Sequence, residues 1–354
     1  MKSWLKEKFA SFSRLREDIR KQAEEKGKNM QEIRRVNRFF LILIVAYIVL
    51  DMAWGFVPAD NTIFLRRFTV LLPELIMLVI GCFYWVRSKV SFRELIRFHS
   101  LSPITILLIL FLSITILPVV TLVNAISMLF ATNIVSGEIG NMLTNSLSFG
   151  IFAIAIVPGF VEEFIYRGII FQSYQKYNWK KAVLLSGFLF GIMHGNFNQF
   201  LYAWVLGMIF AVVVEVTDSI LSTMIMHFMI NGTNVVMAFL LEKYYELFGS
   251  SSAEAMAQSS GQLEIMDVLL LIPSGMIALA ISIGILVLIG KLNGRNQIVY
   301  EKLVGSSKKI KESQKGLEEM KKAAKIKMWT WHLTGGFILC LLLAIMVEFA
   351  ARLQ

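Results

Sequence analysis

The side chains of this chain that could do chemistry are ionisable groups inside long apolar segments. Such groups are costly to bury in a membrane, so they usually mark a function. They are Asp51, Glu74, Glu162, Glu163, Arg167, His194, Glu215, His227 and His332. Three clusters within residues 158–231 combine carboxyl, imidazole and amide groups. A set of this kind can activate a water molecule and stabilise an oxyanion.

The first cluster is a pair of adjacent glutamates followed by an arginine. Glu163 and Arg167 are four residues apart, so on a helix they share a face and can form an ion pair. Glu162 points about 100° away from that face and is predicted to act as a general base or acid. A structural ion pair at the end of a span would explain Glu163 and Arg167, but it would leave Glu162 unexplained.

The second and third clusters each contain a histidine. Phe190 precedes His194 by one turn, and His227 precedes Asn231 by one turn, so each pair lies on one helical face. A lone histidine in a membrane span is more often a packing residue than a catalytic one. Here two of the four histidines lie in spans near the double glutamate, which favours a shared site.

The depth of these residues can be estimated from the basic loop Lys176–Lys181. Glu162 precedes this loop and His194 follows it, each at about 20 Å along a helix, so both are predicted to lie at one level. Counted from Ser219, His227 lies roughly 12 Å into its helix and is predicted to be somewhat shallower.

A polar break follows the second cluster. The helix Ala182–His194 is too short to span, so the break Gly195–Gln199 is predicted to lie at membrane depth. Irregular backbone is tolerated there only inside protein or beside a water-filled cavity. The carboxylate, imidazole and amide groups of the three clusters are predicted to surround such a cavity.

The composition indicates what kind of secondary structure holds these residues. The chain has 354 residues, of which 56% are hydrophobic and only 17% are charged, and its mean hydropathy is +0.65. This excludes an ordinary soluble, disordered or collagen-like chain. Only two cysteines are present, so a disulfide scaffold is excluded too, and Cys82 and Cys340 are interpreted as small buried hydrophobes. We predict an all-α, polytopic helical membrane protein with about eight to nine transmembrane helices.

The sequence divides into six segments by charge and hydropathy. They are a basic amphipathic cytosolic N-terminus (1–38), three transmembrane helices with their loops (39–146), a catalytic core of four helices (147–241), an outer loop and a transmembrane helix (242–290), a basic cytosolic tract (291–327) and a C-terminal transmembrane helix (328–354). The N-terminal segment is expected to form an interfacial helix ahead of a first span at Phe39–Val57.

The net charge of +10 is concentrated at Met1–Arg38 and Lys291–Lys327. Such blocks could bind nucleic acid, but beside membrane spans they favour anchoring to anionic lipid, so no nucleic-acid partner is expected.

The positive-inside rule places the N-terminus in the cytosol and the C-terminus outside. We expect a multi-pass protein of a bacterial cytoplasmic membrane.

At the three clusters the sequence resembles the CPBP family, which comprises the CAAX proteases and bacteriocin-processing enzymes and is also called the Abi family. The family pattern is Glu-Glu-x-x-x-Arg, Phe-x-x-x-His and His-x-x-x-Asn in three successive helices. The matching residues are Glu162, Glu163, Arg167, Phe190, His194, His227 and Asn231. Three motifs in this order make a specific signal, and the resemblance covers about Leu147–Leu241.

The resemblance implies an intramembrane endopeptidase with a CPBP-type core. Glu162 and His194 would activate the attacking water. His227 and Asn231 would stabilise the tetrahedral oxyanion. The residues that order the site would be Glu163, Arg167 and Phe190.

No cofactor is expected, with zinc as the alternative. Glu162, His194 and His227 are zinc ligands by type, although the chain has no HExxH motif.

The expected substrate is a peptide or a membrane protein, because prenylated CAAX substrates require a prenylating cell.

Two other functions compete with a protease. One is a non-catalytic immunity or adaptor protein that keeps the fold and binds a membrane-protein partner. The other is a transporter that relays protons, which gains no support because the sequence shows no internal repeat. The complete set of motifs favours the protease.

Overall fold

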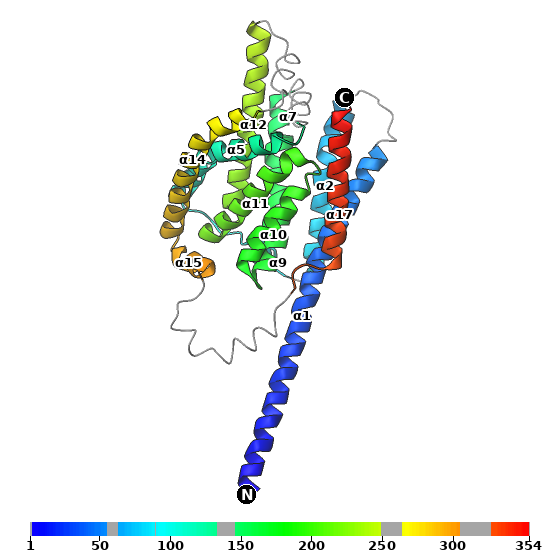
Figure 1. The fold of residues 1–354 in the computed structure, drawn as a ribbon, viewed down its shortest axis with the longest axis vertical. Coiled ribbons are helices and arrows are strands. Elements are labelled where there is room, and N and C mark those ends of the chain that lie inside the picture. The colour runs from blue at the N-terminus through cyan, green and yellow to red at the C-terminus, as the bar shows by residue number, and fades with distance from the viewer. Residues whose placement is uncertain are drawn as a thin grey trace.

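The computed structural model describes residues 2–54, 63–88, 90–132, 146–248, 264–304 and 327–353. Every regular element in these ranges is a helix (Figure 1). The helices are α1 (Lys2–Trp54), α2 (Ile63–Ser88), α3 (Phe92–Ile96), α4 (Pro103–Thr115), α5 (Leu117–Met128), α7 (Leu147–Gly150), η1 (Ile151–Ile156), α8 (Val157–Glu163), η2 (Phe164–Phe171), α9 (Gln172–Gln175), α10 (Trp179–Ile192), α11 (Phe197–Thr217), α12 (Leu221–Phe248), α14 (Ile265–Leu292), α15 (Asn296–Val304) and α17 (Trp331–Arg352).

Seven of the described helices are long and apolar enough to cross a membrane. The polytopic helical fold predicted from composition is therefore confirmed, with fewer such helices than the eight to nine expected. The 14 residues of α10 extend only about 21 Å, short of a membrane core of about 30 Å. The apolar end of α1, from Phe39 to Trp54, extends about 24 Å and is also not among the seven.

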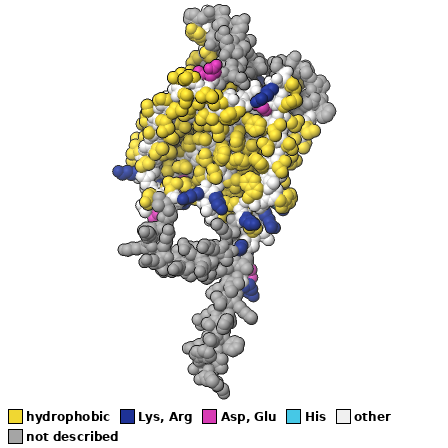
Figure 2. All heavy atoms as spheres, viewed as in Figure 1, with side chains coloured by type: hydrophobic (Ala, Val, Ile, Leu, Met, Phe, Trp, Pro, Cys, Tyr) yellow, Lys and Arg dark blue, Asp and Glu magenta, His cyan; other side chains and the backbone are white. Residues whose placement is uncertain are grey.

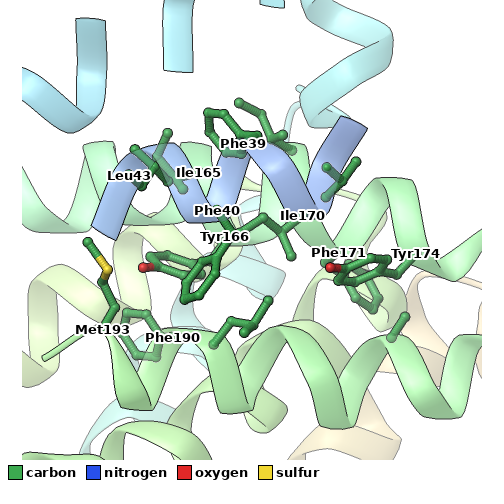
Figure 3. Packing of buried hydrophobic residues seen from close by; sticks show 14 of the residues in the cluster. Phe39, Phe40, Leu43, Ile165, Tyr166, Ile170, Phe171, Tyr174, Phe190 and Met193 are labelled. Atoms are coloured by element: carbon green, nitrogen blue, oxygen red, sulfur yellow. The ribbon is translucent and has the colours of Figure 1, made fainter. Parts of the chain in front are cut away.

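The expected interfacial helix and the expected first span form one helix, α1, of 53 residues. Figure 1 shows its N-terminal half running straight out of the bundle. Its apolar half packs beside η2: Phe40, Leu43 and Ile44 are buried with Ile165 and Ile170 in one core (Figure 3). This packing fixes the helix that carries the glutamate pair.

The rod Leu147–Gln175 is a continuous apolar helix with two π-helical stretches, η1 and η2, on either side of the double glutamate. Pro158 lies between them and has no N–H to donate to the carbonyl of Ile154, four residues earlier. The side-chain amide of Asn231 donates to that carbonyl instead, at 2.9 Å. The rod and α12 are thereby joined beside the first motif.

Glycines bring α10 and α11 into backbone contact. A Cβ atom at Gly191 would lie 2.6 Å from the carbonyl oxygen of Phe200, and one at Gly207 would lie 2.7 Å from the Cα of Gly187. Close helix contacts of this kind in membranes use small residues. They hold the C-terminal end of α10, two residues before His194, against α11.

We expect Gly191→Ala to destabilise the protein by about 1–3 kcal/mol, because the added methyl group meets backbone atoms that cannot move aside. Gly284→Ala is the matched control, since a Cβ atom there has nothing within 4 Å. It should leave stability unchanged or raise it by up to about 1 kcal/mol. Thermal unfolding of both variants in detergent measures the difference, and equal midpoints would contradict the tight contact.

Candidate active site

Three elements bring the predicted residues together. Glu162, Glu163 and Arg167 lie on the rod at the junction of α8 and η2. Phe190 is near the end of α10, with His194 just beyond it, while His227 and Asn231 are on α12. The phenylalanine ring is at the centre, because its centroid lies 5.1 Å from the His194 ring and 6.0 Å from the His227 ring.

The predicted Glu163–Arg167 pair forms in the core. The Arg167 Nη1 atom lies 3.0 Å from Glu163 Oε1, and the two side chains are 1% and 0% exposed. The guanidinium nitrogens are not aligned for a hydrogen bond, so the contact is an ion pair by distance. The guanidinium carbon lies 4.3 Å from the ring centroid of Phe190 and 4.8 Å from that of Phe210, which adds cation–π attraction.

His227 bridges the two glutamates. Its Nδ1 lies 3.0 Å from Glu163 Oε1, and its Nε2 lies 3.6 Å from Glu162 Oε2. The prediction that His227 is shallower than Glu162 was therefore wrong. The turn before α12 is covered by protein, with Ser219 and Ile220 both 0% exposed, and the Ile220 N–H donates to the carbonyl of Arg97.

His194 is held in one tautomer by the backbone. Its Nδ1 lies 2.9 Å from the carbonyl oxygen of Phe190, which can only accept, so Nδ1 carries the proton. Nε2 is then left with a lone pair, as a general base requires. The chain turns sharply after this residue, with Gly195 at φ 67°, and α11 begins at Phe197. A break is therefore present as predicted, but it covers Met193–Asn196 and not Gly195–Gln199, because Phe197–Gln199 already belong to α11.

A cavity of about 180 Å³ lies beside these groups. It is lined by Tyr47, Pro73, Glu74, Met77, Glu162, Tyr166, Phe190, Met193, His194 and Gln199. At about 30 Å³ per water, this volume has room for several water molecules or for a short piece of substrate backbone. Glu162 and His194 are the two predicted water-activating residues, and they share this cavity.

Asn231 and His227 are absent from the lining of this cavity. One amide hydrogen of Asn231 is donated to the carbonyl of Ile154. An amide nitrogen carries two hydrogens, so the second remains for another acceptor. Its role as an oxyanion donor stays a prediction.

Three further polar residues of the cavity are not among the matching residues of the three motifs. Glu74 follows Pro73 in α2, is 9% exposed, and has a carboxyl oxygen without a partner among the described residues. Its side chain lines the same cavity as Glu162. The other two are Gln199 and Tyr166, whose buried hydroxyl also has no partner in the described ranges. Glu74 had a sequence signal as an ionisable residue inside a span, and Gln199 had one as the end of the polar break, whereas Tyr166 had none.

The geometry of the site does not fit zinc. Within the described residues, no group of three or more His, Cys, Asp or Glu side chains is arranged to hold a metal ion. Glu162, His194 and His227 therefore do not form the convergent three-ligand set that a catalytic zinc needs.

Comparison with known proteins identifies the segment that carries the three motifs. Residues 144–233 match the family model described as Rce1-like, type II CAAX prenyl endopeptidase. No curated protein and no solved structure matches the chain. The matched model describes a protease family, which supports a peptidase within a multi-pass membrane protein. The resemblance to the CPBP family that the motifs predicted is thus confirmed over residues 144–233.

Proposed function

We propose that this protein is an intramembrane endopeptidase that cleaves a peptide bond with a water molecule activated between Glu162 and His194. The observation that carries the proposal is that both side chains line one cavity, at the break between α10 and α11. Glu162 accepts the proton of the water, helped by the lone pair on His194 Nε2. The protonated pair then returns the proton to the leaving amine.

The other residues act on charge and position. His227 donates from Nδ1 to Glu163 and turns Nε2 toward Glu162, which holds its ring beside the proposed general base. We assign oxyanion stabilisation to a proton on Nε2 of His227, since the Nδ1 hydrogen is already donated, and to the second amide hydrogen of Asn231, with the Tyr166 hydroxyl as a further donor at the cavity wall. Each of these groups would have to lie near 3 Å from the oxyanion in the bound state.

We further propose a bacterial cytoplasmic membrane location with the protruding end of α1 in the cytosol. Figure 2 shows a hydrophobic face with Lys and Arg side chains gathered along its lower border, the end from which α1 protrudes. That distribution agrees with the positive-inside rule. The substrate class we favour is a peptide or membrane protein, reached from the surrounding lipid.

A proteomic comparison of cells that carry wild-type protein or Glu162→Ala tests the function. Peptides that accumulate uncut in the variant would be synthesised and incubated with purified protein. Cleavage by the wild type and not by the variant supports the proposal. An identical set of peptides in both cells would favour the immunity or adaptor function instead.

Activity is expected to survive dialysis against strong chelators, with less than one equivalent of zinc per chain. A glutamate–histidine pair can deprotonate water without a metal. Elemental analysis of the active protein, before and after dialysis, measures this. Stoichiometric zinc whose removal abolishes cleavage, and whose return restores it, would overturn the metal-free mechanism.

A further inference from the structure

A basic cleft of about 670 Å³ lies at the end of the bundle from which α1 protrudes. Five elements contribute to its walls: α1, the end of α2, the loop around α3, α9 and α15. Its charged lining residues are Lys28, Glu32, Arg35, Arg97, Lys176 and Lys302. The lining therefore has five cationic side chains and one carboxylate. The cleft shares no lining residue with the cavity at Glu162.

Some of these cations are already neutralised. Lys176 Nζ lies 2.7 Å from Glu32 Oε1. Arg97 and Lys302 share the carboxylate of Glu215, which is 0% exposed, at 3.3 and 2.7 Å. These pairs fix the cleft walls, and they join α3, α11 and α15.

Lys28 and Arg35 have no carboxylate within ion-pair distance in the part of the chain that the structure describes. They are seven residues apart on α1, two turns, so they face the same side of the helix. The one carboxylate of the lining, Glu32, lies near Arg35 but also binds Lys176 and the Tyr177 hydroxyl, so its single negative charge cannot balance Lys28, Arg35 and Lys176 together. Two positive charges are left facing the cleft.

Neutral donors add to this charge. The Nε2 atom of Gln172 is buried in the wall and has no acceptor among the described residues, while its Oε1 accepts from Gln175. A buried amide donor without an acceptor is costly, and an anion in the cleft would satisfy it.

The position of the cleft indicates where its ligand comes from. α2 ends at Ser88 and α9 at Gln175, and both residues line the cleft. Apolar helices end where the phosphate layer of a bilayer begins, and basic pockets at that level bind anionic headgroups.

We propose that this cleft binds a phosphate group, carried either by an anionic phospholipid or by a soluble phosphorylated compound. Lys28 and Arg35 supply the charge, since arginine matches two phosphate oxygens at once and lysine adds a point charge. Gln172 donates from the wall. This site does not depend on the proposed protease activity.

The test uses the full-length protein and two double variants with equal charge change. Lys28→Gln/Arg35→Gln removes the two cleft cations. Arg34→Gln/Arg38→Gln is the control on the same helix, because those arginines lie outside the cleft, toward His332. Binding of pyrophosphate in detergent is measured by calorimetry, with potassium chloride at matched ionic strength as the reference. Thermal unfolding is compared in nanodiscs of phosphatidylcholine with and without phosphatidylglycerol.

The cleft variant should weaken binding at least roughly tenfold, the loss expected when a charge-assisted hydrogen bond is removed, while the control stays within about twofold of wild type. Pyrophosphate binding identifies a soluble ligand, and stabilisation by phosphatidylglycerol alone identifies a lipid. Absence of both effects would overturn the proposal. An equal loss in the two variants would also overturn it, because it would show a diffuse response to surface charge.

Discussion

Glu162→Gln is expected to lower the rate of peptide cleavage by about 10²–10⁴-fold without unfolding the protein. Glutamine keeps the size of the side chain, but it cannot accept a proton from water. His194→Ala should cause a loss of similar size, because it removes the lone pair on the other side of the same cavity. Turnover by purified variants on a peptide found in the cellular comparison measures both losses.

Glu348→Gln is the matched control for this experiment. Glu348 is a half-buried carboxylate in α17 that binds Arg352 and Thr132, outside the cavity. Its replacement should leave turnover within about twofold of wild type, as expected for a partly exposed ion pair away from the site. Near-wild-type cleavage by Glu162→Gln would remove the basis for a glutamic mechanism.

Glu163→Ala is expected to destabilise the protein by about 3–5 kcal/mol, considerably more than Glu162→Ala. The carboxylate of Glu163 is the partner of both Arg167 and His227. Its removal leaves a guanidinium that is 1% exposed without a counter-charge. Thermal unfolding in detergent compares the two variants.

A double variant separates charge from packing in this comparison. Glu163→Ala/Arg167→Leu removes both charges and should be more stable than Glu163→Ala alone, since no buried charge is left unpaired. Equal unfolding midpoints for Glu163→Ala and Glu162→Ala would contradict the different roles assigned to the two glutamates.

The parts of the site that were predictable from sequence are local. The Glu163–Arg167 pair follows from a spacing of four residues on one helix, and the break after His194 follows from a helix too short to span. The membrane fold follows from composition and apolar runs. None of these depends on how distant helices rotate against each other.

The parts that could not be predicted are contacts between helices. The bond from His227 to Glu163 joins residues 64 apart in sequence, and its existence depends on a buried turn at Ser219 that resembles a surface loop in sequence. Glu74 shares a cavity with Glu162 only because α2 packs against α8. Hydropathy identifies a buried carboxyl group, but it does not identify the partner.

The cavity wall has an evolutionary consequence. The residues assigned to catalysis all lie within 144–233, whereas Tyr47, Pro73 and Met77 of the same cavity come from α1 and α2, outside the matched segment. Under the proposed function, the hydrolytic machinery and the surface that meets the substrate are encoded in separate stretches of the gene. Substitutions in α1 and α2 can then alter which peptide is accepted while the reacting groups stay unchanged, so a lineage of such proteins can change its targets without reinventing its chemistry.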